Sequence, residues 1–275
     1  MASASFSIRK LTPAIGAEIS GIDLNDAMNT ATQDAIYQAL LDNLVIFFRD
    51  QDITPERHLA FAKTFGTIDK PHPVYAHYPG YENIVVLEND AGNPADTNEW
   101  HTDVTFQQEP PFASILVARE VPDCGGDTLW ASMYAAYDAL SDRMKSYLEG
   151  LTALHDGEPQ YRGRYADRGV DDAGKVYPRC NHPVVRTHPD TGRKCLFVNP
   201  IFTQRINDIP RVESDAILRM LHEHCASEDF QVRFRWQAGS VAFWDNRCAQ
   251  HLAIWDYYPN LRSGFRVTIK GDRPR

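Results

Sequence analysis

The chain has 275 residues, of which 43% are hydrophobic and 24% charged, a balance typical of folded globular proteins that excludes wholesale disorder. Its 28 basic and 37 acidic side chains give a net charge of −9, which argues against nucleic acid or an anionic membrane as a main partner. No apolar run approaches the roughly 20 residues of a membrane span, and the opening Met1–Ser5 lacks the features of a signal peptide. The five cysteines form no Cys-x-x-Cys pair. We therefore expect a reduced, cytoplasmic protein.

Four helices are predicted from apolar residues that recur at helical spacing. Thr54-Pro55 combines a capping residue with proline at the first helical position, and Ser141 is able to restart the third helix part-way along. His58 is expected on the surface of the second helix. The predicted helices are Thr32–Asn43, Thr54–Gly66, Met133–Leu151 and Glu213–Ala226.

The remaining apolar runs are short and bounded by turn sequences, as strands are. The predicted strands are Leu44–Phe48, Ile84–Leu87, Ser114–Ala118, Thr128–Trp130, His182–Thr187, Cys195–Asn199, Phe230–Trp236, Ser240–Trp244 and Ser263–Ile269. Many strands with few helices, and no regular alternation of the two, predict a mainly β protein, a barrel or jelly roll flanked by helices. No linker divides the chain, so we expect one domain over residues 1–275, in which the polar segment Gly157–Arg179 is a long loop that serves as an active-site lid.

The sequence His-x-Asp occurs twice, at His101-Thr-Asp103 and at His188-Pro-Asp190. The second copy continues as Pro-Asp-Thr-Gly, which is typical of a turn, so we interpret Asp190 as a hairpin residue. The first copy lies in Trp100–Phe106, whose β-favouring residues predict a strand. Because residues two apart on a strand point to the same face, His101 and Asp103 are expected to project together.

His251, just after a predicted strand, is the strongest candidate for a third metal ligand. Two histidines and one carboxylate on one face of a metal leave about three of six octahedral positions open, which suits Fe(II) enzymes that bind a co-substrate and O₂ together. A zinc hydrolase is the alternative, but a closed zinc site takes a fourth protein ligand, typically cysteine, and none lies beside His101.

Two arginines follow His251 on the alternating segment Arg262–Lys270. Arg262 and Arg266 fall on the same face, roughly 13 Å apart at about 3.3 Å per residue. A guanidinium clamps a carboxylate or sulfonate through two parallel hydrogen bonds, so this face is suited to binding two anions. An ordinary half-solvated strand alternates in the same way, and an internal pair between Arg266 and an acid such as Asp256 is a further alternative.

Together these features resemble the taurine dioxygenase family of Fe(II)- and 2-oxoglutarate-dependent dioxygenases, and the likeness covers nearly the whole chain. The segments that carry it are Ile15–Gly21, Phe48–Gln51, His72–Tyr75, Trp100–Phe106, Gly125–Trp130, His182–Pro189, Phe197–Asn199 and Trp244–Asn246. The resemblance implies a double-stranded β-helix, which is a jelly roll flanked by helices. It also implies Fe(II) as the metal, 2-oxoglutarate and O₂ as co-substrates, and a homo-oligomer as the assembly.

The resemblance further assigns roles to individual residues. It implies that the iron ligands are His101, Asp103 and His251. It implies that the distal carboxylate of 2-oxoglutarate is held by Thr128 and Arg262. It implies that the prime substrate is surrounded by His72, Tyr75, Val104 and Arg266, with His72 and Arg266 at its sulfonate. Two positions depart from the family pattern: an asparagine near the substrate amine is Thr97 here, and the Ser-Phe pair of the lid reads Gln160-Tyr161.

The reaction that the resemblance implies is hydroxylation of a small organic anion, taurine or a related alkanesulfonate, at the carbon next to sulfur. The product then collapses to an aldehyde and sulfite, while 2-oxoglutarate becomes succinate and CO₂. An alkyl sulfate or an aryloxyalkanoate is the alternative substrate, because Thr97 and the altered lid change the end of the pocket where taurine carries its ammonium. A non-catalytic cupin-like binding protein is the alternative from another class, although such a protein needs neither Asp103 nor Arg262.

Overall fold

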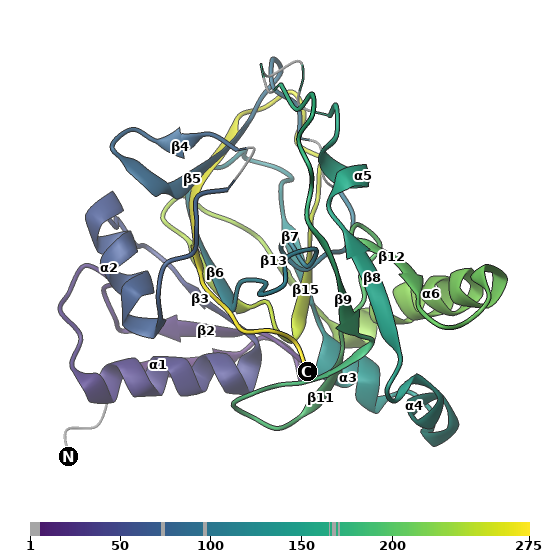
Figure 1. Ribbon diagram of the computed structural model, residues 1–275. Coiled ribbons are helices and arrows are strands. Elements are labelled where there is room, and N and C mark those ends of the chain that lie inside the picture. Colours follow the sequence, from purple (N-terminus) through teal and green to yellow (C-terminus); the bar gives the residue numbers. More distant parts are fainter. Residues whose placement is uncertain (1–5, 73–74, 96–97, 165, 167–168, 170) are drawn as a thin grey trace.

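Eight strands form the largest sheet of the protein (Figure 1). The computed structural model describes residues 6–72, 75–95, 98–164, 166, 169 and 171–275. In spatial order the strands are Ser7–Lys10 (β1), Ala17–Ser20 (β2), Val45–Phe48 (β3), Val241–Asp245 (β14), Ala113–Glu120 (β6), Arg262–Ile269 (β16), Tyr81–Asn89 (β5) and His77–Tyr78 (β4). Only β2 and β3 pair in parallel, and the other neighbours are antiparallel.

A second, smaller sheet packs its side chains against this one. Its strands, in spatial order, are Gln231–Phe234 (β13), Thr128–Ser132 (β7) and Ala249–Ala253 (β15). Phe47 of β3 stacks on Phe234 of β13 with ring centroids 3.9 Å apart, and it meets Trp130 of β7 at 5.2 Å. The main hydrophobic core therefore lies between two facing antiparallel sheets, and the predicted mainly β jelly roll is confirmed.

Two helices, Thr30–Asn43 (α1) and Pro55–Phe65 (α2), cover the opposite face of the large sheet (Figure 1). The predicted start of α2 is confirmed, because the Thr54 side chain accepts a hydrogen bond from the Arg57 amide. The position expected for His58 is wrong. Its side chain is buried and its Nε2 donates to the Ile115 carbonyl of β6 at 3.1 Å, so this histidine joins the helix to the sheet.

The other side of the jelly roll carries the remaining elements (Figure 1). They are helices Met133–Asp138 (α3), Asp142–Leu148 (α4), Glu158–Tyr161 (α5) and Arg211–Cys225 (α6), the 3₁₀ turn Glu228–Phe230 (η2), the sheet formed by Thr203–Ile206 (β12), Thr152–Asp156 (β8) and Arg179–Pro183 (β9), and the hairpin Val185–Thr187 (β10) and Lys194–Leu196 (β11). As predicted, Ser141 restarts the third helix, because its side chain caps α4 at the Met144 amide. No helix in the described part of the chain is long and apolar enough to span a membrane.

Several predicted strand boundaries are wrong. The expected strand His182–Thr187 is interrupted at Val184, whose amide bonds to the Leu151 carbonyl rather than to a partner strand. Cys195–Asn199 is a strand only as far as Leu196. The strands β1, β2, β4, β8, β12 and β15 were not predicted. β1 is exposed at all four positions and shows no apolar alternation, so only its pairing with β2 identifies it as a strand.

The strand predicted at Trp100–Phe106 is also wrong. His101 makes a single bridge to His251, with amide-to-carbonyl distances of 3.0 and 2.8 Å, and the chain then turns away. The Gln107 amide bonds back to the Val104 carbonyl, and Val104 takes the unusual φ of 41°. The β propensity of Trp100–Phe106 favoured an extended segment, but the chain forms this local turn instead.

Candidate active site

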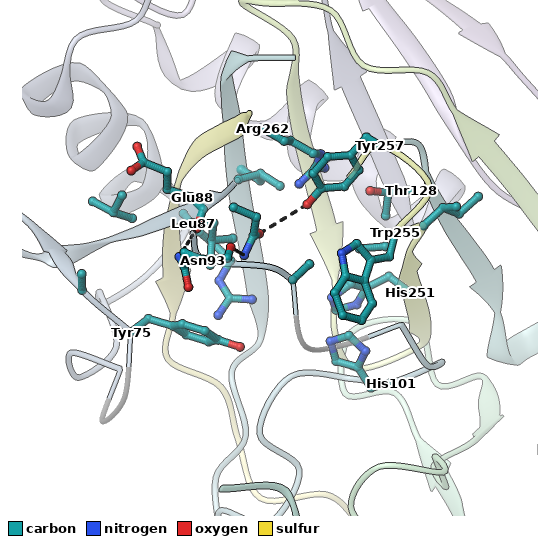
Figure 2. Close-up of a pocket in the computed structure, with 18 of the residues that line it drawn as sticks. Tyr75, Leu87, Glu88, Asn93, His101, Thr128, His251, Trp255, Tyr257 and Arg262 are labelled. Carbon is teal, nitrogen blue, oxygen red and sulfur yellow. Dashed lines mark hydrogen bonds between the residues drawn. The ribbon is translucent and has the colours of Figure 1, made fainter. Parts of the chain in front are cut away.

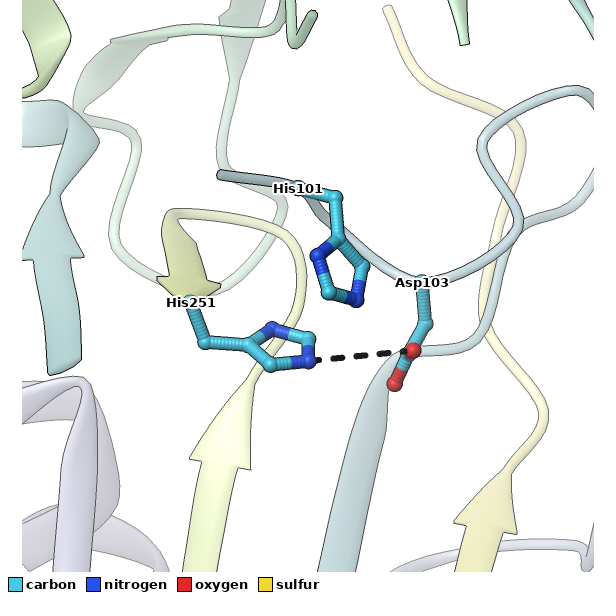
Figure 3. A group of neighbouring side chains, drawn as sticks. All are labelled: His101, Asp103 and His251. Carbon is cyan, nitrogen blue, oxygen red and sulfur yellow. Dashed lines mark ion pairs between the residues drawn. The ribbon is translucent and has the colours of Figure 1, made fainter. Parts of the chain in front are cut away.

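His101, Asp103 and His251 come together at one end of the jelly roll, as the sequence predicted. One donor atom from each lies within 4.8 Å of the others, and His251 Nε2 is 4.0 Å from Asp103 Oδ1. Figure 3 shows the two imidazoles and the carboxylate pointing toward a shared space. The arrangement does not come from a common strand face. It arises because the backbone of His101 pairs with that of His251, which lies within β15.

The protonation states of this triad fit a divalent metal. Burial lowers the pKa of both His101 and His251, so both imidazoles are neutral. His101 Nδ1 donates to the Glu99 carbonyl at 2.9 Å, which leaves its Nε2 lone pair for a ligand bond. Burial alone raises the pKa of Asp103, but the charge of Arg266 and a hydrogen bond from Ser114 outweigh burial and keep this carboxyl ionised.

Asp103 presents its two oxygens to different partners. Oδ2 accepts a hydrogen bond from the Ser114 hydroxyl of β6 at 2.7 Å. Oδ1 faces His251, and it also accepts from Arg266 Nη1 at 3.0 Å. Two neutral imidazoles and one fixed carboxylate are the donor set of the facial triad that holds non-haem Fe(II). The chemistry of these residues therefore fits iron.

Thr128 and Arg262 lie together some distance along the same cavity. The Thr128 hydroxyl accepts from Trp236 Nε1 at 2.9 Å. Arg262 Nε donates to the Gly126 carbonyl at 3.1 Å, and its guanidinium lies over the Trp236 and Tyr257 rings. Among the described residues Arg262 has no acidic partner, and burial lowers its pKa. A carboxylate from a bound molecule would supply the missing counter-charge.

Arg266 lies on the same face of β16 as Arg262, as predicted, and both line the cavity. Its side chain is only 8% exposed, and its Nε has no hydrogen-bond partner among the described residues. Asp256, the acid considered as an alternative partner, instead accepts from the Gly126 amide at 2.7 Å. The internal acid that Arg266 does contact is Asp103, one of the three residues of the triad.

His72 and Tyr75 lie next to each other, with ring centroids 4.5 Å apart. Burial lowers the pKa of His72 to about 3, so its imidazole is neutral. Because Nδ1 accepts from the Tyr75 amide at 3.3 Å, the proton of this neutral ring is on Nε2. Tyr161 of α5 approaches the His72 ring at 5.9 Å, so the predicted lid segment reaches this part of the site.

Val104 lies in an apolar cluster beside the triad rather than in the cavity wall. Its neighbours in this cluster are Phe106, Tyr161, Tyr177, Ile201 and Phe202, and Tyr75 packs against it. Thr97 lies outside the described residues.

The cavity that connects these groups has a volume of about 480 Å³ (Figure 2). The predicted site residues that line it are Tyr75, His101, Thr128, His251, Arg262 and Arg266. His72, Asp103 and Val104 are not among the lining residues, although each lies next to one of them or contacts one. The lining residues that the sequence did not single out include Leu116, Trp130, Trp244, Ile254, Trp255 and Tyr257. Trp255 and Tyr257 follow His251 by only four and six residues, and this closeness in sequence could have identified them as lining residues.

Comparison with known proteins agrees with this geometry. The family model described as "Taurine catabolism dioxygenase TauD, TfdA family" matches residues 7–268. The chain belongs to this family. An alkylsulfatase from Acinetobacter baylyi is 37% identical over 273 residues, which are 96% of this chain and 85% of that protein. A sulfate ester dioxygenase from Pseudomonas putida that depends on alpha-ketoglutarate, another name for 2-oxoglutarate, is 37% identical over 94% of this chain and 88% of its own.

The fold of this TauD-family chain also matches a solved structure. The crystal structure of a taurine dioxygenase from Burkholderia xenovorans superimposes with a TM-score of 0.86 at 36% identity, and the match covers 98% of this chain and 91% of that one.

The second His-x-Asp copy of this TauD-family chain has a different place in the structure. His188 is fully buried and its Nε2 donates to Asp245 at 3.0 Å, while its Nδ1 accepts from the Asp190 and Thr191 amides. Arg247 also binds Asp245 and reaches Asp190 at 2.6 Å. The interpretation of Asp190 as a hairpin residue is confirmed, since it lies between β10 and β11. Every polar atom of His188 is paired, so this cluster is structural.

Proposed function

We propose that this chain oxidises a small organic anion bearing a sulfur oxyanion, an alkanesulfonate such as taurine or a sulfate ester. The chain is a 2-oxoglutarate-dependent non-haem iron dioxygenase. The observation that carries the substrate proposal is Arg266, a buried cation whose Nε has no partner among the described residues and whose acidic partner, Asp103, is itself a proposed metal ligand. A buried charge of this kind is costly unless an anion neutralises it.

We place iron on His101, Asp103 and His251 and the distal carboxylate of 2-oxoglutarate on Arg262 and Thr128. Iron bound there supplies the oxidation of a substrate C–H bond by O₂, coupled to conversion of 2-oxoglutarate to succinate and CO₂. The protein positions the metal and the co-substrate and keeps water away from them. His101, Asp103 and His251 would hold the metal beside the cavity, and Arg262 would fix the far end of the co-substrate through a charge-assisted pair.

The anionic end of the substrate belongs, in this proposal, between Arg266 and His72. Arg266 supplies the charge, and the neutral His72 has its proton on Nε2, the donor that an oxyanion requires. An anion held there presents its adjacent carbon toward the triad. Hydroxylation of that carbon in a sulfonate yields an aldehyde and sulfite, whereas in a sulfate ester it yields an aldehyde and sulfate. Both substrate classes therefore use the same arrangement of residues.

The other end of the substrate is proposed to be apolar. The cavity lining includes several apolar side chains, namely Val86, Leu87, Ala95, Leu116 and Ile254, beside the polar Glu88, Asn89 and Asn93. A short aliphatic tail loses unfavourable contact with water when it packs there. In this proposal longer alkanesulfonates and alkyl sulfates are therefore preferred over taurine, because their tails have more apolar surface to pack against these side chains.

A substrate panel tests this proposal. Taurine, hexanesulfonate, hexyl sulfate and an aryloxyalkanoate are each supplied with Fe(II), ascorbate and 2-oxoglutarate, and oxygen consumption, succinate, sulfite and sulfate are measured. Turnover of hexanesulfonate or hexyl sulfate with matching release of sulfite or sulfate is the expected result. Exclusive turnover of the aryloxyalkanoate contradicts the sulfur oxyanion. If no succinate forms, coupled or uncoupled, with verified bound iron, the enzyme assignment fails as well.

We also propose that residues 1–275 act as one domain, that the lid is the segment Gly157–Arg179, and that the enzyme is a cytoplasmic homo-oligomer. The family match over residues 7–268 supports a single catalytic unit. Sedimentation at several concentrations tests the assembly. Family membership also weighs against the cupin-like binding protein and the zinc hydrolase, as does the presence of both Asp103 and Arg262.

A further inference from the structure

Trp255 lines the cavity from the loop between β15 and β16. Figure 2 shows its indole between the two histidines of the triad on one side and Thr128 with Arg262 on the other. The indole is 38% exposed, whereas the other cavity tryptophans, Trp130 and Trp244, are 0% and 1% exposed. Trp255 is therefore the tryptophan of the cavity wall that has one side toward solvent.

The chain on both sides of Trp255 is tied to the segment that leads into β7. The Ile254 amide donates to the Asp127 carbonyl at 2.8 Å, and the Asp256 carboxylate accepts from the Gly126 amide at 2.7 Å. The Gly126 carbonyl in turn accepts from Arg262 Nε at 3.1 Å. The same short segment thus fixes the loop of Trp255 and the guanidinium, so the indole has a defined position relative to Arg262.

We propose that Trp255 contacts 2-oxoglutarate and covers it between its two anchoring points. This inference rests on the proposed function, which places one end of the co-substrate at the triad and the other at Arg262. Between its two ends 2-oxoglutarate has only methylene groups, and an indole face is a suitable apolar cover for them. The cover also keeps water from the pair between Arg262 and the carboxylate, which strengthens that pair.

The test measures co-substrate binding without any prime substrate. Mn(II) and the unreactive analogue N-oxalylglycine are titrated into the wild-type protein and into Trp255→Ala and Trp255→Phe, with affinity read by calorimetry and by tryptophan fluorescence. Trp255→Ala is expected to weaken N-oxalylglycine about tenfold, equivalent to leaving roughly 50 Å² of apolar surface in water. Trp255→Phe keeps a ring at the same place, so it is expected to lose only about threefold.

Fluorescence separates contact from a general structural effect. The analogue is expected to change the tryptophan emission of the wild-type protein, and most of this change is expected to disappear in Trp255→Phe although binding persists. Tyr147→Ala is the control, because Tyr147 is a comparably exposed aromatic, 45% exposed, on α4. Its affinity and emission change are expected to match those of the wild type.

Unchanged N-oxalylglycine affinity in Trp255→Ala would overturn the inference. An equal loss in Tyr147→Ala would overturn it too. These outcomes leave the proposed function intact as long as the wild-type protein binds Mn(II) and the analogue. If the wild-type protein binds neither, the proposed function fails, and the inference about Trp255 fails with it.

Discussion

His101 and His188 begin the two His-x-Asp copies but contact different partners. Substitution of His101 is expected to affect activity, and substitution of His188 is expected to affect stability. His101→Ala removes a ligand atom from the triad, so turnover of 2-oxoglutarate is expected to disappear while the unfolding transition stays in place. His188→Ala removes a hydrogen bond to the buried Asp245 carboxylate, so the free energy of unfolding is expected to fall by roughly 2–3 kcal/mol. Urea unfolding and succinate formation, measured on both variants, check the pair. Loss of activity in a fully stable His188→Ala would contradict the assignment.

Arg262 is expected to act on the co-substrate alone. Arg262→Ala removes a charge-assisted partner worth roughly 1.5–3 kcal/mol, so the apparent KM for 2-oxoglutarate is expected to rise roughly 10- to 100-fold. The KM for the prime substrate is expected to change little. Arg193→Ala is a matched control, because this arginine forms an ion pair with Asp138 on the surface, away from the cavity. If only the KM of the prime substrate rises, 2-oxoglutarate does not bind at Arg262 and the prediction is contradicted.

At the scale of elements, His58 makes the contact between α2 and β6 sensitive to pH. Burial lowers the pKa of His58 from 6.5 to about 4. Between pH 6.5 and pH 4, His58 is protonated in the unfolded chain but stays neutral in the folded chain. The free energy of unfolding therefore falls as the pH drops from 6.5 to 4, and below pH 4 this contribution no longer changes. The loss at this site is about 3 kcal/mol over that range.

His58→Gln tests this pH dependence, because glutamine keeps an N–H donor for the Ile115 carbonyl but does not titrate. Urea unfolding of the wild type and the variant is compared at pH 7 and pH 4.5. The wild type is expected to lose more stability than the variant between these two values. An identical loss in both proteins would show that other buried groups cause the acid sensitivity.

The elements that could be predicted from the sequence depend on local contacts. The start of α2 at Thr54-Pro55 and the start of α4 at Ser141 follow from capping, which involves neighbours in the chain. The grouping of His101, Asp103 and His251 was predicted, but the strand expected to present His101 and Asp103 does not exist. Their convergence depends on a bridge to His251, about 150 residues away, and nothing in the local sequence encodes such a partner. Burial of His58 escaped prediction for the same reason.

At the scale of the whole molecule, the proposed metal and co-substrate join the two sheets of the jelly roll. His251 lies on β15 of the small sheet, and Arg262 lies on β16 of the large one. Asp103 is tied to the large sheet through Ser114 of β6. A metal bound to Asp103 and His251, with 2-oxoglutarate extending to Arg262, therefore forms cross-links that exist only in the folded state. Such ligands stabilise the folded protein by mass action.

Mn(II) together with N-oxalylglycine, each at about 100 times its Kd, is expected to add about 5.4 kcal/mol to the free energy of unfolding, about 2.7 kcal/mol from each ligand. For a chain of this size that gain raises Tm by roughly 10 °C, which calorimetry resolves. Asp103→Asn is the matched variant, because it keeps a side chain of nearly the same size beside Ser114 and Arg266 but weakens the metal site. Its Tm is expected to rise little with the same additions. An equal rise in both proteins would mean that the metal binds outside the triad.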